Sequence, residues 1–284
     1  MKKFMMPVLL LLMGALVVGC GQKEEATETT EEQTTEETTT EQTSEEGFTY
    51  SKDKIVVGLD DTFAPMGFRD ENNEIVGFDV DLMKEVSNEL GIPFELQPIT
   101  WSMKETELNN GNIDLIWNAY SITPEREEKV LFTKPYLENK QVVVVRADSD
   151  INTLADLSGK VVAAQAESSA VDAMESKPEI KDTFAELTTF ETNNDCLMDL
   201  EAGRADAVVG DEVLINYYIT LRGAENYKVL EENFGEELYG IGARKEDEAL
   251  VAAIDKALDT IAENGKGAEI SNKWFGSEKL VRDK

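Results

Sequence analysis

The chain has no histidine and only two cysteines, Cys20 and Cys196. Without histidine, neither a Ser-His-Asp relay nor a His-ligated zinc site can be built. If Cys20 is modified, as argued below, Cys196 has no partner for a disulfide or a thiolate cluster. We therefore expect no catalytic triad, no metal site and no cofactor, and a fold that is stabilised by its hydrophobic core.

Basic residues and long apolar runs are also scarce. Lys and Arg number 27 against 58 Asp and Glu, which gives a formal net charge of −31. Such an excess of carboxylates argues against nucleic acid or an anionic membrane face as a partner. Beyond the first twenty residues no long apolar run exists, so the remainder is predicted to be an acidic globular chain.

The first twenty residues indicate export. Lys2 and Lys3 precede an apolar run, 8–18, that is too short to span a bilayer and stops at Gly19-Cys20. This pattern is typical of a secretory signal, and the alternative is a plain signal peptide with an incidental cysteine. The sequence Val17-Val18-Gly19-Cys20 resembles a bacterial lipobox, which implies that 1–20 is a lipoprotein signal peptide and that Cys20 is diacylated.

The segment 21–47 consists almost entirely of Glu, Thr, Gln and Ser. It contains no apolar residue larger than Ala26, so ordering it would bury too little surface to offset the lost conformational entropy. We predict a disordered tether. An interaction tail for a specific partner is the alternative.

From residue 48 onward, strand and helix signals alternate, which predicts an α/β fold with mostly parallel sheet. Leu82, Val86 and Leu90 recur every four residues before Gly91, a typical helix stop. The acidic segment 231–237 is interpreted as a lead into the last strand. Strands are predicted at 55–59, 94–99, 113–117, 141–145, 161–164, 205–209 and 238–243. Helices are predicted at 79–90, 103–110, 168–174, 193–202 and 212–221. One further helix is predicted to begin at Thr123-Pro124, and a last, long helix is predicted from the stripe of Leu250, Ile254, Leu258 and Ile261.

Six motifs in this part of the chain resemble the amino-acid-binding lipoproteins of bacterial ABC importers, which belong to a bilobed group that also includes the ligand domains of glutamate receptors. They occur in the family's order and near its spacing, and the match covers nearly all of 48–284. The motifs are Val57-Gly58-Leu59-Asp60-Asp61-Thr62-Phe63-Ala64-Pro65-Met66, Gly77-Phe78-Asp79-Val80-Asp81-Leu82, Gly111-Asn112-Ile113-Asp114-Leu115, Ser121-Ile122-Thr123-Pro124-Glu125-Arg126, Gly210-Asp211-Glu212-Val213 and Ile270-Ser271-Asn272-Lys273-Trp274-Phe275.

The resemblance implies two lobes of mostly parallel sheet with flanking helices, joined by two hinge segments. The first lobe would comprise 48–139 and the returning segment 236–284, and the second lobe would comprise 140–235. The hinges would lie near 138–140 and 234–237, and a ligand would be enclosed when the lobes swing together.

The resemblance also assigns roles to residues for the two charged groups of an amino acid. Arg126 would hold the carboxylate, because guanidinium offers a planar fork for two parallel hydrogen bonds. By itself, an arginine beside Glu125 and Glu127 would be interpreted as a solvated helix residue. Asp211 would hold the ammonium, and its alternative role is an N-cap. Further contacts would come from the loop Asn118-Ala119, from the Ser121 hydroxyl, and from the amides and hydroxyl of Ser168 and Ser169.

For the ligand side chain, the resemblance places Phe63 and Trp101 as aromatic walls, with Asp60 facing the same pocket. Each aromatic residue could instead belong to the core. Glu167 stands where relatives commonly have glycine, and 117–120 replaces a stretch often built of Ser and Gly. An added carboxylate and two aromatic faces favour a cationic side chain such as arginine or lysine. Alternatively Glu167 faces solvent, which leaves glutamine, other polar amino acids or cystine.

The predicted function is therefore a non-enzymatic, lipid-anchored binding protein on the outer face of the cytoplasmic membrane. It would act as a monomer, close on one amino acid and present it to an ABC permease. Two alternatives remain at this stage: a lipoprotein that binds amino acids only to signal, and a cyclic-acid dehydratase on the same scaffold, for which Glu167 is the only suggestive acid.

Overall fold

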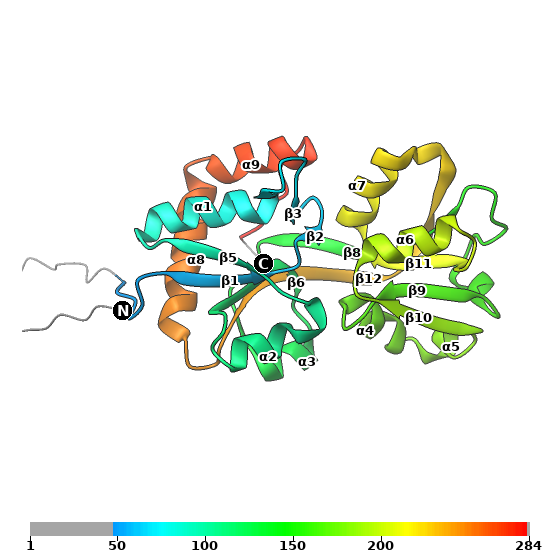
Figure 1. The fold of residues 1–284 in the computed structure, drawn as a ribbon, viewed down its shortest axis with the longest axis horizontal. Helices are drawn as coiled ribbons and strands as arrows, with labels where there is room; N and C mark the ends of the chain where they lie inside the picture. Colours follow the sequence, from blue (N-terminus) through cyan, green and yellow to red (C-terminus); the bar gives the residue numbers. More distant parts are fainter. Residues whose placement is uncertain (1–47, 283–284) are drawn as a thin grey trace, which may run out of the picture. The chain divides into compact units, whose positions relative to one another are not determined.

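The computed structural model describes residues 48–282 (Figure 1). The predicted signal peptide, the lipobox with Cys20 and the tether over 21–47 lie outside the described residues. The helices are α1 (Phe78–Leu90), α2 (Lys104–Asn109), α3 (Pro124–Lys129), α4 (Ser169–Glu175), α5 (Pro178–Lys181), α6 (Asn193–Glu201), α7 (Glu212–Arg222), α8 (Glu248–Glu263) and α9 (Lys266–Phe275).

The strands follow the predicted alternation with the helices. They are β1 (Ile55–Leu59), β2 (Thr62–Phe63), β3 (Gly67–Arg69), β4 (Ile75–Val76), β5 (Phe94–Pro98), β6 (Leu115–Ser121), β7 (Leu131–Phe132), β8 (Leu137–Arg146), β9 (Val161–Gln165), β10 (Glu186–Phe190), β11 (Ala207–Asp211) and β12 (Tyr227–Ala243). The predicted α/β class is confirmed.

The main sheet has the strand order β10-β9-β11-β8-β12-β6-β1-β5, and β7 also pairs with β12. The pairs β10–β9, β9–β11, β6–β1 and β1–β5 are parallel. Every pairing that involves β8 or β12 is antiparallel. The parallel strands therefore occupy the two ends of this order, and two long antiparallel strands occupy its centre.

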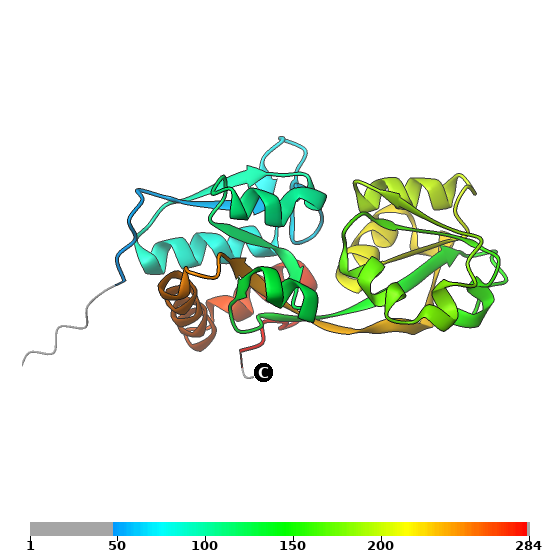
Figure 2. The same ribbon diagram turned by 90° about the horizontal axis from the view of Figure 1, so that it is seen from below.

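β8 and β12 run between two groups of helices and strands (Figure 1), and the view from below shows them as neighbouring long strands (Figure 2). In their register Asn139 lies opposite Glu237, and Gln141 lies opposite Gly235. The two segments predicted as hinges are therefore paired with each other. The predicted lobe boundaries fall on these strands and stay a prediction.

One sequence interpretation is wrong in its bounds. The acidic segment 231–237 is not a lead into the last strand but lies inside β12, which begins at Tyr227. Its Glu, Asn and Gly residues have low strand propensity, so the local signal is weak. The register shifts on either side of Asn233, and the segment is held in the sheet by pairing with residues 139–142 of β8.

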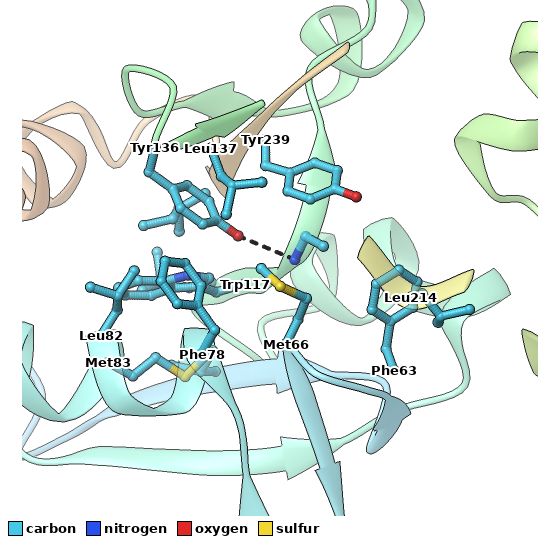
Figure 3. Packing of buried hydrophobic residues seen from close by; sticks show 14 of the residues in the cluster. Phe63, Met66, Phe78, Leu82, Met83, Trp117, Tyr136, Leu137, Leu214 and Tyr239 are labelled. Atoms are coloured by element: carbon cyan, nitrogen blue, oxygen red, sulfur yellow. Dashed lines mark hydrogen bonds between the residues drawn. The ribbon is translucent and has the colours of Figure 1, made fainter. Parts of the chain in front are cut away.

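The helical stripes pack as their spacing predicts. Phe78, Leu82 and Met83 of α1 pack near Trp117 and Tyr136 (Figure 3). Helix α1 ends where Gly91 adopts φ 66°, and the predicted stripe of α8 is buried. A separate hydrophobic cluster contains Val143, Val145, Val162 and Val209.

Burial raises the pKa of the Cys196 thiol to about 12. Between residues 48 and 282, no helix has the length and hydrophobicity needed to cross a bilayer.

Candidate functional site

The candidate site lies where several strands of the sheet end. β6 ends at Ser121, β9 at Gln165 and β11 at Asp211, while Asp60 directly follows β1. The sequence placed the ends of β6 and β11 earlier, at 117 and 209; the observed strands extend to the polar residues themselves. β1 and β6 run antiparallel to β9 and β11, yet side chains at their carboxyl ends meet, Asp60 with Gln165 and Ser121 with Ser169. In open α/β sheets, ligands bind outside the carboxyl ends of parallel strands, so the place where these strand ends meet is the expected site for a small ligand.

Arg126 is buried near the place where these strands end, with 4% of its surface exposed. The Thr123 hydroxyl accepts a hydrogen bond from the Arg126 backbone N–H at 3.2 Å, which confirms the predicted N-cap of α3. The guanidinium donates to the carbonyl oxygens of Ser121 and Glu167, each at 3.2 Å, and lies 4.8 Å from the ring centroid of Tyr120. The alternative of a solvated helix residue is therefore wrong.

Asp211 is equally buried, with 4% exposed. Its Oδ1 accepts hydrogen bonds from Asn139 Nδ2 at 2.7 Å, Gln141 Nε2 at 3.0 Å and the Tyr239 hydroxyl at 2.6 Å. Although Asp211 precedes α7, its side chain makes no capping bond to that helix. Burial, together with the charge of Glu237, raises the pKa of this carboxyl well above its usual value.

A chain of side-chain contacts joins the surroundings of these two charged residues. The Ser121 hydroxyl lies 2.9 Å from that of Ser169, and Gln141 Nε2 donates to Ser169 Oγ at 3.1 Å and to Asp211. Since Arg126 donates to the Ser121 carbonyl, a buried guanidinium and a buried carboxyl group stand at opposite ends of one polar network. Such an arrangement matches the two charges of a zwitterion.

Asp60 forms a second polar group at the site. It is 6% exposed, and its Oδ1 accepts from the Thr62 N–H and hydroxyl at 2.9 and 2.7 Å. Its Oδ2 accepts from Gln165 Nε2 at 2.8 Å, and Gln165 Oε1 accepts from Asn193. Burial raises the pKa of Asp60. This buried carboxylate is surrounded by neutral donors rather than by a cation.

Asn118 and Ala119, which the sequence interpretation placed in a loop, lie inside strand β6, because that strand continues to Ser121. Ala119 adopts φ 51°, and its N–H donates to Asp79 Oδ2 at 2.8 Å and to the Tyr136 hydroxyl at 3.2 Å, the latter drawn in Figure 3. Asn118 Oδ1 accepts from the Asp60 N–H at 3.1 Å. Asp79 is fully buried, and burial raises its pKa to about 7. Asp79, which belongs to α1, therefore holds the backbone of β6 at Ala119.

Glu167 turns its carbonyl, not its carboxylate, toward the site. The residue is exposed and adopts φ 54°, which agrees with the alternative that its side chain faces solvent. Its carbonyl oxygen accepts from Lys104 Nζ at 2.9 Å as well as from Arg126. Lys104 is 2% exposed and lies 5.2 Å from the Trp101 ring centroid. Burial, together with the nearby Arg126, lowers the pKa of Lys104 to about 8.

The two aromatic residues are both buried, but they belong to different clusters. Phe63 packs in the cluster that includes Leu214, and the two side chains are seen together in Figure 3. Trp101 belongs to another cluster and meets Tyr120 edge-on, with ring centroids 5.8 Å apart. That they form facing walls of one side-chain pocket stays a prediction.

Several buried polar atoms around the candidate site have no hydrogen-bond partner within residues 48–282. They are Asn118 Nδ2, Ser168 Oγ, Asn139 Oδ1 and Gln141 Oε1. Buried polar groups in folded proteins are nearly always paired, so a cluster of unpaired donors and acceptors marks a place for a polar ligand. In the same described range, no group of Asp, Glu or Cys could hold a metal ion.

Four further residues contact the predicted site residues but were not singled out from the sequence. They are Lys104, Gln141, Gln165 and Glu237. Gln141 and Gln165 stand at the ends of apolar strand runs, and that position was the available signal for them. Lys104 carries no such signal, because a lysine near the start of a polar helix is usually solvated.

The matching family covers most of this chain. Residues 55–277 match the bacterial extracellular solute-binding proteins of family 3. The chain is 30% identical over 228 residues to ABC transporter arginine-binding protein 1 of Escherichia coli K12, which spans 78% of this chain and 91% of that protein.

Solved structures agree with this match. An ABC uptake transporter substrate-binding protein from Streptococcus pneumoniae with bound histidine is 42% identical, with a TM-score of 0.79 over 81% of this chain and 95% of that chain. The structure of Tv2483 bound to L-arginine is 33% identical, with a TM-score of 0.77 over 82% and 95%. The chain thus belongs to the family 3 bacterial extracellular solute-binding proteins, whose members bind solutes rather than catalyse reactions.

Proposed function

We propose that this protein binds one free α-amino acid between its two lobes and presents it to the permease of an ABC importer. One observation carries the proposal: Arg126, in α3 after β6, and Asp211, at the end of β11, are both buried, and Ser121, Ser169 and Gln141 join their surroundings. An amino acid that leaves water must find a partner for each of its charges.

In this proposal Arg126 binds the ligand carboxylate with two N–H groups, and Asp211 accepts from the ammonium. Asn118 Nδ2 and Ser168 Oγ are buried without partners and would complete the polar contacts. The Ser168 N–H already donates to the Gln165 carbonyl at 3.4 Å, so the hydroxyl is the better-supported ligand contact of that residue.

For the ligand side chain we propose a cationic group, as in arginine, lysine or histidine. Asp60 supports this, since its carboxylate is buried and its hydrogen-bond donors within residues 48–282 are all neutral. The names of the relatives add weight, because two of the similar proteins bind arginine and one holds histidine. Glu167 no longer contributes to the argument, because its side chain is exposed.

The lobes are proposed to join where β8 and β12 pair, near 138–140 and 234–237. Around the site, the two proposed lobes already contact each other through hydrogen bonds. Lys104 and Arg126 donate to Glu167, Gln165 donates to Asp60, and the Tyr218 hydroxyl donates to the Thr62 carbonyl at 2.8 Å. Because these contacts surround the proposed ligand site, opening the lobes would break them and expose the site to water.

We also propose that the protein is attached to the outer face of the cytoplasmic membrane through a diacylated Cys20. This proposal rests only on the lipobox in the sequence. Mass spectrometry of the mature N-terminus from a bacterial host tests this. A diacylglycerol mass on Cys20 is expected, and an unmodified cysteine would remove the anchor from the proposal.

A thermal-shift screen of residues 48–284 against the twenty amino acids, ornithine and cystine tests the binding function. A ligand that binds only the folded chain must raise the melting temperature. We expect the largest shift from arginine, lysine or histidine, with affinity confirmed by titration calorimetry. If no amino acid raises the melting temperature, the proposed function is wrong; if only neutral ones do, the cationic preference is wrong.

A further inference from the structure

Glu237 brings a second carboxylate to the ammonium end of the site. Its Oε1 accepts from Asn139 Nδ2 at 2.6 Å and from Gln141 Nε2 at 2.7 Å, the same two amide groups that donate to Asp211 Oδ1. It also lies 3.5 Å from the Ser169 hydroxyl. Glu237 therefore touches the polar network that links Asp211 to Arg126.

The two carboxylates come from different parts of the fold. Asp211 ends β11, whereas Glu237 lies on β12, opposite Asn139 in the register where the predicted hinge segments pair. Figure 1 shows β12 running from one group of elements to the other. A ligand group bound by both carboxylates would contact the second lobe and the crossing strand together.

No cationic side chain pairs with Asp211 among the interactions described for residues 48–282. Its donors are two amides and a tyrosine hydroxyl, all neutral. Two carboxylates that share donors repel each other, so the pair needs either a shared proton or a cation. A ligand ammonium at this position supplies the cation.

We propose that Glu237 binds the ammonium of the amino acid jointly with Asp211 and sets how strongly the site holds it. This inference rests on the proposed function and adds to it a residue on the crossing strand. Burial and the charge of Glu237 raise the pKa of Asp211, so binding of the ammonium releases a proton from Asp211 to solvent. Affinity should consequently rise with pH.

Other charged groups lie near Glu237 and contribute to its field. A cavity of about 500 Å³ on this strand pair is lined by Glu237 and by further charged side chains from β8, α7, β12 and the C-terminal segment. These are Glu138, Lys140, Glu212, Glu236 and Lys279. Lys140 pairs with Glu236 at 3.6 Å, and Tyr239 donates to Asp211. Among the five, the acids outnumber the lysines, so the surroundings reinforce the preference for a cationic group.

The test compares Glu237→Gln with Glu236→Gln by titration calorimetry, using whichever amino acid binds the parent protein. Both variants lose one negative charge on β12, but the Glu236 side chain is 80% exposed and points to Lys140 rather than to the site. Titrations at about pH 5 and about pH 7.5 stay below the range in which an α-amino group loses most of its proton. Repeating them in buffers of different ionisation enthalpy counts the protons released.

For the parent and Glu236→Gln we expect affinity to increase with pH and protons to be released at pH 7.5. For Glu237→Gln we expect affinity about tenfold lower or more at pH 7.5, a shallower pH profile and less proton release, because burial still raises the pKa of Asp211 but the charge of Glu237 no longer does. If Glu237→Gln binds as tightly as the parent and releases as many protons, the inference is wrong. If the parent binds no amino acid, the proposed function fails instead, which is a distinct result. Equal melting temperatures of the two variants without ligand show that folding is not the cause of a difference.

Discussion

Lys104 and Arg126 donate hydrogen bonds to the same backbone oxygen, that of Glu167, at 2.9 and 3.2 Å. Two buried cations from α2 and α3 thus converge on a carbonyl that directly precedes Ser168. The contact crosses from the first proposed lobe to the second, beside the residues proposed to bind the ligand carboxylate.

Lys104→Met should weaken ligand binding more than it weakens folding. The change removes a charged hydrogen bond across the lobes, worth about 1.5–3 kcal/mol, but it also removes the cost of burying an ammonium whose pKa has fallen to about 8. We expect affinity for the bound amino acid to fall about tenfold, with a small change in melting temperature. Lys84→Met, at a side chain 62% exposed, is the control. Unchanged affinity would show that the contact does not support the bound state.

Arg126→Ala should cost about 2–5 kcal/mol of ligand affinity, because the buried ligand carboxylate loses its partner. Arg126→Lys should also bind poorly, since a single ammonium does not reproduce the guanidinium fork. Lys129→Ala, on the same helix and 45% exposed, removes the same charge away from the site. Calorimetric titration of all three decides the matter, and near-parental binding by Arg126→Ala would retire the assignment.

Asp60→Asn should change side-chain preference rather than overall binding. The amide keeps an acceptor for Thr62 but removes the buried negative charge. We expect arginine or lysine to lose about tenfold or more in affinity, and glutamine to lose much less. Asp61→Asn is the neighbouring control, because Asp61 pairs with Arg69 at 2.6 Å instead of facing the site. Equal losses for charged and neutral ligands would argue against a side-chain role.

Glu167→Gln should leave ligand affinity and preference within about twofold of the parent. The side chain is exposed, and the contact with Lys104 and Arg126 is made by the backbone carbonyl, which glutamine retains. A surface charge at this exposure contributes little. A loss of arginine affinity of about tenfold, with glutamine affinity unchanged, would restore the carboxylate to the site.

Asp79→Asn should flatten the dependence of stability on pH. Burial raises the pKa of Asp79 from 3.8 to about 7, so between these values the folded chain binds more protons than the unfolded chain. Stability contributed by this group therefore falls as pH rises through that window, by at most about 4 kcal/mol. Thermal melts at about pH 5 and about pH 7.5 should show a smaller fall for Asp79→Asn than for the parent. Asp148→Asn, 88% exposed, should melt like the parent, and an equally steep fall in Asp79→Asn would contradict the prediction.

Much of the fold follows from local patterns in the sequence. Helix α1 and its stop at Gly91, the Thr123 cap and the stripe of α8 were predicted because their signals lie within a few residues of each other. The acidic part of β12 was misread because its place in the sheet depends on β8, almost a hundred residues away along the chain. Tertiary pairing overrode the local propensity there.

The candidate site divides in the same way. Arg126 and Asp211 were predicted through motif resemblance, and the structure buries both and links their surroundings through one polar network. The sequence did not predict Glu237, Gln141 or Lys104, because each of them contacts the site only when segments that are distant in the sequence meet. A glutamate in an acidic stretch and a lysine in a polar helix are usually solvated, and nothing in their neighbours along the chain indicates otherwise.

The pairing of Asn139 with Glu237 has an architectural consequence. Neighbouring antiparallel strands place opposed residues about 5 Å apart, so the chain enters and leaves residues 140–236 at two adjacent positions of the sheet. In topological terms, residues 140–236 form an insert carried by a single hairpin-like stem. A different insert with the same two attachment points could replace it without moving the parts of β8 and β12 that lie outside residues 140–236.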